Sequence, residues 1–426
     1  MSLGAGALIA KRRRALALSL VALTSFALAG CGASETLPAA NVKSTARAAS
    51  QPATTAAAPP RTHSPPTLAR MLGQMIVTRF PRTRPSRALL ARIREGRVGG
   101  VILFADNVSG GENQTRALVT RLQRAASERG NPPLLVMTDQ EGGEVKRLPW
   151  APPTLAPREM SSTAVARAEG EATGMALRAV GINVDLAPVA DVERAAGSFL
   201  RTRAFGSDPA TVGSLACQFA EGLASQGVAF TLKHFPGLGR ALTSTDEQAT
   251  TVEAQGTVLR EDYLPYRDCG ASHSALVMVS SAIYPSLSGP MPAVLSPEIY
   301  REELPLATGG SPPTISDDLQ AAALAAEGAT AERAINAGLD LLLYGQNEGG
   351  AAIAFGRLIE LANAGGITRS RLEEADTAIQ SLKGLVAGAS APPSEGTASY
   401  PESVGAPETV QPEAQAPVES TKQAEG

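Results

Sequence analysis

Residues 228–240 read Val228-Ala229-Phe230-Thr231-Leu232-Lys233-His234-Phe235-Pro236-Gly237-Leu238-Gly239-Arg240. The first five side chains are β-branched, aromatic or aliphatic, which is typical of a short buried strand. The Pro and Gly residues that follow indicate a loop. Lys233 and His234 therefore stand where the predicted strand ends. Two polar side chains at such a point make this stretch the first candidate for a functional site.

Short apolar runs of the same kind recur on both sides of this stretch and alternate with amphipathic segments. The predicted strands are Gln74–Thr78, Gly99–Phe104, Leu134–Thr138, Ile182–Leu186, Val228–Leu232, Ala275–Val279, Pro313–Ser316 and Leu339–Leu343. The predicted helices are Arg87–Arg94, Thr115–Arg129, Ala164–Val180, Thr211–Gln226 and Gln320–Ala337. Strands that alternate with helices predict a parallel sheet with right-handed crossovers. Eight such units predict an α/β fold, a closed (β/α)₈ TIM-type barrel in one domain, with a doubly wound open sheet as the alternative.

Polar residues follow the predicted strand ends at five places. They are Asp139, Asp191, Lys233 with His234, Ser281 and Asp317. Active sites of such barrels lie at the carboxyl ends of the strands. The barrel reading therefore predicts that these side chains meet in one pocket.

The N-terminal residues 1–31 are expected to be a signal peptide. The basic segment Lys11–Arg14 precedes the apolar run Ala15–Ala27, which is too short to span a membrane. The run ends in Leu28-Ala29-Gly30-Cys31, which resembles the lipobox of bacterial lipoproteins. This resemblance implies lipidation of Cys31 and an extracytoplasmic protein anchored to the cell membrane. A plain secretory signal is the alternative.

Two further segments lack the large apolar side chains that a core requires. Residues 32–66 are rich in Ala, Ser, Thr and Pro and are expected to be a disordered tether, and residues 387–426 a disordered tail. The folded barrel is then expected over residues 67–386. The formal net charge of −3 indicates no nucleic-acid partner. We expect a monomer that contacts the membrane surface through its lipid anchor, and the family resemblance described below implies a carbohydrate substrate.

Cysteine and histidine are scarce. Besides Cys31, only Cys217 and Cys269 occur, and they either pair outside the cytoplasm or remain free thiols. No Cys/His spacing suggests a metal site, and we expect neither a metal nor a cofactor.

The stretch that begins at Lys233 resembles the Lys-His-Phe-Pro-Gly-His-Gly loop of glycoside hydrolase family 3, in the branch of bacterial β-N-acetylhexosaminidases. Four further segments resemble the family: Thr138–Arg147, Gly181–Asp191, Arg203–Pro209 and Thr314–Leu319. The resemblance implies a retaining β-glycosidase that acts on cell-wall or other β-linked glycans.

The same resemblance implies roles for individual residues. Asp317 corresponds to the nucleophile of the family. The sugar would be bound by Asp139, Arg203, Lys233 and His234. Asp318 is expected to cap a helix or to support its neighbour, and Asp185 and Asp191 are expected to be structural.

The chain departs from the family where the proton is handled. Leu238 replaces the second histidine of the loop, and Ser244-Thr245-Asp246 falls where relatives have Asp-Ser-His. The chain has only three histidines, His63, His234 and His273. Neither His63 nor His273 lies near this loop in the sequence. Asp246 or Glu247 could take over as acid/base. Otherwise activity is impaired and limited to good leaving groups, or the protein is a catalytically degenerate glycan-binding envelope lipoprotein.

Overall fold

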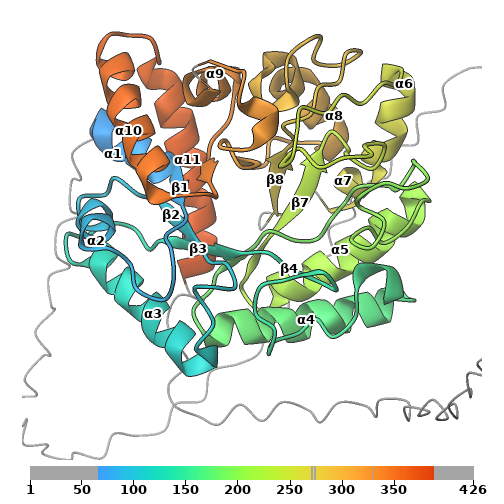
Figure 1. Cartoon of the computed structure of the whole chain (residues 1–426), viewed down its shortest axis with the longest axis horizontal. Helices are drawn as coiled ribbons and strands as arrows, with labels where there is room; N and C mark the ends of the chain where they lie inside the picture. Colours follow the sequence, from blue (N-terminus) through green and yellow to red (C-terminus); the bar gives the residue numbers. More distant parts are fainter. Residues whose placement is uncertain (1–65, 270–271, 273–274, 329, 388–426) are drawn as a thin grey trace, which may run out of the picture. The chain divides into compact units, whose positions relative to one another are not determined.

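Eight parallel strands form the centre of the computed structural model, which describes residues 66–269, 272, 275–328 and 330–387. In these residues the sheet has the strand order β10-β1-β2-β3-β6-β7-β8-β9, and helices surround it (Figure 1). The strands are β1 (Ile76–Thr78), β2 (Gly100–Ile102), β3 (Leu135–Thr138), β6 (Val184–Asp185), β7 (Ala229–Phe235), β8 (Ala275–Val279), β9 (Thr314–Ser316) and β10 (Leu342–Tyr344). Nearly every strand residue is buried, as expected of a parallel sheet covered on both faces.

The two ends of the strand order meet. A parallel bridge joins Ile315 to Leu341, and the amide of Leu341 donates to the carbonyl of Thr314 at 2.9 Å. The amide of Ser316 donates back to the carbonyl of Leu341 at 3.0 Å. These bonds close the sheet into a barrel. The predicted (β/α)₈ fold is confirmed, and the open doubly wound sheet is excluded.

Only Ala275–Val279 has the predicted strand bounds, and two of the differences change the position of functional or structural residues. The run Gln74–Thr78 is divided, because α1 (Leu68–Met75) takes its first two residues and is capped by Thr67. Strand β7 runs on to Phe235, so Lys233 and His234 lie inside the strand rather than after it. Short apolar runs do not distinguish strand from buried helix by periodicity, which explains the first difference.

The helices on one side of the barrel follow the prediction closely. They are α2 (Arg87–Arg94), α3 (Gly111–Ser127), α4 (Thr163–Ala179) and α5 (Pro209–Ser225). Asp208 caps α5 by accepting from the amide of Thr211 at 2.9 Å, and Pro209 follows at the first helical position. Helices α4 and α5 lie side by side in close contact (Figure 1), since a Cβ on Gly170 would stand 2.2 Å from the carbonyl oxygen of Phe219.

The predicted helix Gln320–Ala337 is wrong in its first half. A single 3-10 turn, η5 (Ala322–Leu324), precedes α9 (Thr330–Ala337). The chain turns after β9 because the Asp318 carboxylate binds the amide of Gln320 instead of leaving that amide to a helix.

The sequence analysis did not predict the other α-helices of the described residues. They are α1, α6 (Gly256–Leu259), α7 (Leu264–Cys269), α8 (Leu304–Thr308), α10 (Glu348–Asn363) and α11 (Arg369–Val386).

Several predictions fall outside the described residues: the signal peptide with Cys31, nearly all of the tether and tail, and His63 and His273. Among the helices that are described, none combines the length and apolar character needed to cross a membrane.

Candidate active site

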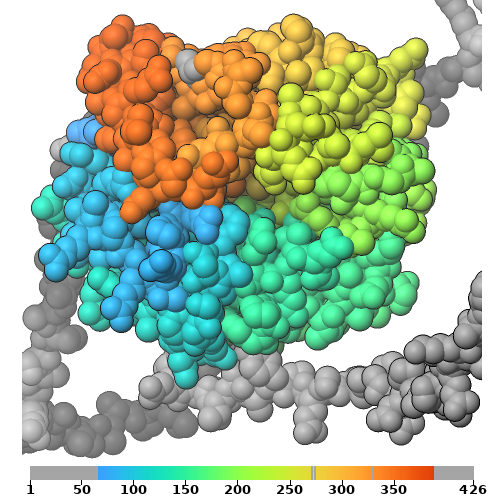
Figure 2. Space-filling model, in the orientation of Figure 1, coloured from blue at the N-terminus to red at the C-terminus, as the bar shows by residue number. Residues whose placement is uncertain are grey.

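A cavity of about 390 Å³ opens at the carboxyl ends of the strands. Figure 2 shows this face hollowed near its middle, where segments from the blue, green and orange parts of the chain meet. The cavity is lined by residues from strands or strand-end loops around the barrel, among them Phe104, Asp139, Arg147, Phe199, Arg203, Lys233, His234, Leu238, Thr245, Asp246, Met278, Asp317, Asp318 and Gln346. The fold thus gathers polar side chains that lie far apart in the sequence.

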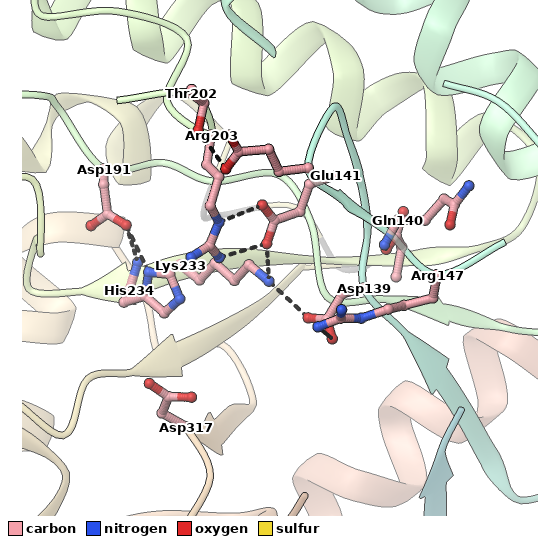
Figure 3. A network of polar contacts seen from close by, with 12 residues as sticks. Asp139, Gln140, Glu141, Arg147, Asp191, Thr202, Arg203, Lys233, His234 and Asp317 are labelled. Carbon is pink, nitrogen blue, oxygen red and sulfur yellow. Dashed lines mark hydrogen bonds and ion pairs between the residues drawn. The ribbon is translucent and has the colours of Figure 1, made fainter. Parts of the chain in front are cut away.

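A chain of ion pairs forms one wall of the cavity (Figure 3). The Lys233 Nζ lies 2.9 Å from Asp139 Oδ1 and 2.7 Å from Glu141 Oε1. Arg203 donates to both oxygens of Glu141, at 2.8 Å from Nε and 2.7 Å from Nη2. Two cations thus balance two anions, and this pairing offsets the desolvation free energy of burying the four charges.

The ionisation of this network follows from the same contacts. Burial alone would raise the pKa of Glu141, but the charges of Lys233 and Arg203 lower it to about 2. Burial also opposes the charged forms of Asp139 and Lys233, yet their mutual attraction lowers the pKa of Asp139 and raises that of Lys233. All four groups are therefore charged at neutral pH, and they offer fixed donors and acceptors to a ligand rich in hydroxyl groups.

A short hairpin carries Asp139 and its neighbours. Strands β4 (Gln140–Gly142) and β5 (Val145–Lys146) pair antiparallel, and Gly142 and Gly143 turn the chain with φ of 96° and 57°. The hairpin returns Arg147 to within 3.5 Å of Asp139 and places its guanidinium over the ring of Phe104, 5.1 Å from the ring centre. A hairpin follows Asp139, so this residue caps no helix.

His234 is oriented by Asp191. Its Nδ1 lies 2.7 Å from Asp191 Oδ2, and the same carboxylate accepts from the amides of His234 at 3.1 Å and Leu238 at 2.6 Å. Because a carboxylate only accepts, the proton of the imidazole pair belongs on Nδ1 and leaves Nε2 unprotonated in the neutral ring. Asp191 was expected to be structural only; in the structure it also orients a side chain of the cavity.

Both oxygens of the Asp317 carboxylate accept a hydrogen bond. The amide of Asp318 donates to Oδ1 at 2.9 Å, and the hydroxyl of Thr245 donates to Oδ2 at 3.2 Å. The neighbouring Asp318 carboxylate accepts from the amides of Gln320 and Gly345. Asp318 caps no helix, contrary to one of the two predictions for it, and instead joins the ends of β9 and β10. Burial raises its pKa to about 6.

Asp246 lies at the rim of the cavity in the loop that follows β7. Its side chain is reached by solvent, but the protein atoms on the cavity side desolvate it and the negative charge of Asp317 acts in the same direction, so its pKa is raised. Glu247 is exposed and does not line the cavity. Leu238, at the position of the family histidine, is buried and apolar.

All six predicted site residues inside the fold line the same cavity: Asp139, Arg203, Lys233, His234, Asp246 and Asp317. Sequence reasoning missed the parts played by Glu141, Arg147, Asp191 and Thr245. Glu141 and Arg147 belong to the segment Thr138–Arg147, so the family motif already indicated their positions. The contact of Thr245 with Asp317 had no signal in the sequence. Ser281 is buried and does not line the cavity. Cys217 and Cys269 are free, and within the described residues no cluster of His, Cys, Asp or Glu is arranged to hold a metal ion.

Known proteins are similar to this chain in sequence. The chain matches the family described as Glycosyl hydrolase family 3 N terminal domain over residues 67–382. An uncharacterized secreted glycosyl hydrolase of Arthroderma benhamiae is 32% identical over 328 residues, which cover 74% of this chain and 93% of that protein. The β-hexosaminidase LpqI of Mycobacterium tuberculosis is 32% identical over 302 residues, which cover 67% of this chain and 76% of that protein.

A solved structure shares the fold as well. It is a glycoside hydrolase family 3 β-N-acetylglucosaminidase from Paenibacillus sp., with a TM-score of 0.72 and 28% sequence identity. The match covers 80% of this chain and 65% of that one, so this chain spans just under two thirds of its length. The family predicted from the motifs is confirmed: the chain is a glycoside hydrolase that belongs to glycoside hydrolase family 3.

Proposed function

We propose that this protein is a retaining β-glycosidase that removes β-linked N-acetylhexosamine, N-acetylglucosamine above all, from cell-wall or related glycans. Relatives named β-hexosaminidase and β-N-acetylglucosaminidase support this sugar. The charged wall made by Asp139, Lys233 and Arg203 supports it too, because fixed carboxylate and cationic groups suit vicinal hydroxyls and a carbonyl oxygen.

The observation that carries the proposal is a pair of unlike carboxyl groups in one cavity. Asp317 accepts a hydrogen bond on each oxygen, and these two bonds hold its carboxylate at the cavity. Asp246 lines the same cavity and has a raised pKa, because of its desolvation and the charge of Asp317. Retaining hydrolysis needs one ionised carboxylate and one carboxylic acid.

In the proposed first step an oxygen of Asp317 bonds to the anomeric carbon while the glycosidic C–O bond breaks. Asp246 gives its proton to the departing oxygen. In the second step Asp246, now ionised, takes a proton from water, whose oxygen displaces Asp317 from the anomeric carbon. His234, held by Asp191, and the ion-paired wall bind the sugar in both steps.

Covalent labelling tests the nucleophile. A 5-fluoro glycosyl fluoride of N-acetylglucosamine should label the parent at Asp317, because fluoride leaves with little protonation. Peptide mass spectrometry should find the label on this residue, and Asp317→Asn should take up none. A label on another residue of the cavity would contradict the assignment.

Leaving-group dependence tests the acid/base. Asp246→Asn should barely change the first step with a dinitrophenyl glycoside, but it should slow cleavage of a disaccharide by roughly 10²–10⁴-fold, because an alkoxide leaves poorly without a proton. Added azide should restore turnover of the dinitrophenyl glycoside, since this anion attacks without a base. Glu247→Gln, one residue along and outside the cavity, is the matched control and should behave as the parent.

Two results would change the proposal. Equal rates of Asp246→Asn and the parent on both substrates would exclude Asp246 and leave an enzyme limited to good leaving groups. No labelling of the parent, together with sugar binding measured by calorimetry, would identify a glycan-binding protein that does not cleave.

We also propose an extracytoplasmic location with a lipid anchor at Cys31. The lipobox-like sequence supports it, as does the relative named as secreted.

A further inference from the structure

Thr245 connects the loop of one carboxyl group of the proposed reaction to the other carboxyl group. It is one residue before Asp246, and its hydroxyl is 3.2 Å from Asp317 Oδ2, although 72 residues separate the two in sequence. The residue is only 2% exposed, so water does not compete freely for this hydroxyl. Facing a carboxylate, which only accepts, the hydroxyl must be the donor.

The loop that carries Thr245 is fastened to the segment that follows Asp317. The carbonyl of Thr245 accepts from the amide of Ala323 at 3.1 Å, and the carbonyl of Asp246 accepts from the amide of Ala322 at 3.4 Å. Both amides belong to η5, the turn after β9. The loop after β7 and the loop after β9 are therefore joined by main-chain bonds that no side-chain substitution removes.

The same loop is also closed on itself at its base. The hydroxyls of Thr243 and Thr250 lie 3.3 Å apart, and Gln248 Nε2 donates to the Thr243 hydroxyl at 3.1 Å. Residues 243–250 thus form a small unit. Hydrogen bonds among Thr243, Gln248 and Thr250 hold its two ends together, and its middle part binds η5. Thr245 is the part of this unit that reaches the carboxylate of Asp317.

We propose that Thr245 is a positioning residue for the nucleophile. Its hydroxyl orients the Asp317 carboxylate, and it belongs to the loop that carries Asp246. One hydrogen-bonded unit therefore determines the positions of both carboxyl groups. This inference rests on the proposed function, in which Asp317 attacks. With the Asp318 amide on the other oxygen, the Thr245 hydroxyl determines how the carboxylate plane faces the cavity. A carboxylate rotated from that plane meets the anomeric carbon less often in a reactive geometry.

The test replaces the hydroxyl by a methyl group of similar size. Thr245→Val should slow covalent labelling by the 5-fluoro glycosyl fluoride by about 10- to 100-fold, the loss expected for one hydrogen bond to a charged group. It should lower kcat for a dinitrophenyl glycoside more than it changes KM. Thr245→Ser, which keeps the hydroxyl, should stay within about threefold of the parent.

A matched control comes from the same loop. Thr251 is exposed, so Thr251→Val removes a hydroxyl away from the cavity and should label as the parent does. If Thr245→Val does not fold, Thr245→Ala, which adds no new atom, takes its place, and equal melting temperatures identify folded variants. A folded variant that lacks the hydroxyl and labels at the parent rate overturns the inference and leaves the proposed function intact.

A crystal structure of each variant gives a readout that does not need activity. The Asp317 carboxylate should be rotated or split between conformers in Thr245→Val and unchanged in Thr245→Ser. If the parent is not labelled at all, the proposed function fails, and these structures still decide the positioning role. An Asp317 side chain in the same rotamer in all three proteins overturns it.

Discussion

At the scale of single residues, one carboxyl group stands apart from the balanced charges of the cavity wall. Asp185, the last residue of β6, is buried, and its Oδ1 accepts from the amide of Gln140 at 2.9 Å. Its Oδ2 has no hydrogen-bond partner in the part of the chain that the structure describes. Burial raises its pKa to about 8, and the charges of Asp139 and Glu141 act in the same direction. Asp185 is therefore mostly neutral at pH 7.

The raised pKa predicts a loss of stability with rising pH. Between an unfolded pKa near 4 and a folded pKa near 8, the folded state binds more protons than the unfolded state, so the contribution of Asp185 is fully present below about pH 4 and is lost as pH rises through 8. Asp185→Asn keeps an acceptor for Gln140 and does not titrate. Its melting temperature relative to the parent should rise by about 2 °C or more from pH 5 to pH 8.5. A pH-independent difference would contradict this.

At the scale of elements, helix α11 carries a charge into the interior beneath the barrel. Lys383 is 2% exposed, and its Nζ donates to Gln74 Oε1 at 2.7 Å and to the carbonyl of Gly99 at 2.8 Å. Gln74 and Gly99 precede β1 and β2, so this lysine fastens the helix to the amino ends of the first strands. Burial lowers its pKa to about 7, because neither partner carries a negative charge.

This lysine should give the opposite pH dependence. The folded state binds fewer protons than the unfolded state between pH 7 and about 10.5, so parent stability should rise with pH in this window, by at most about 1.4 kcal/mol for each pH unit. Lys383→Met, similar in length and uncharged, should lack the rise. Its stability relative to the parent, from urea unfolding at pH 7 and pH 9.5, should therefore fall with pH. Parallel curves for the two proteins would refute the assignment.

At the scale of the whole molecule, the proposed anchor lies in the N-terminal segment and acts on localisation only. Cys31→Ala should prevent lipidation and release the protein into the soluble fraction, because a single cysteine would carry the acyl groups. Western blotting of fractionated cells measures this, and the catalytic rates of the released protein should match those of the parent. Unchanged membrane association would exclude the lipobox reading.

The sequence by itself determined the barrel and the family. The alternation of apolar runs with amphipathic helices is a local property, so Ala275–Val279 and Arg87–Arg94 match β8 and α2 residue for residue. The motifs at Asp139, Lys233 and Asp317 are also local, since each joins a strand end to its loop. Boundaries were less certain, as at Gln74, because a short apolar run suits a strand or a buried helix equally well.

Only the tertiary structure decided how these groups act on one another. Lys233 lies between Asp139 and Glu141, and Thr245 reaches Asp317, through contacts between loops of different strands. Such contacts depend on barrel closure and on loop paths that spacing does not encode. The pKa of a carboxyl group such as Asp246 likewise depends on burial and on neighbouring charge, which exist only once the chain has folded.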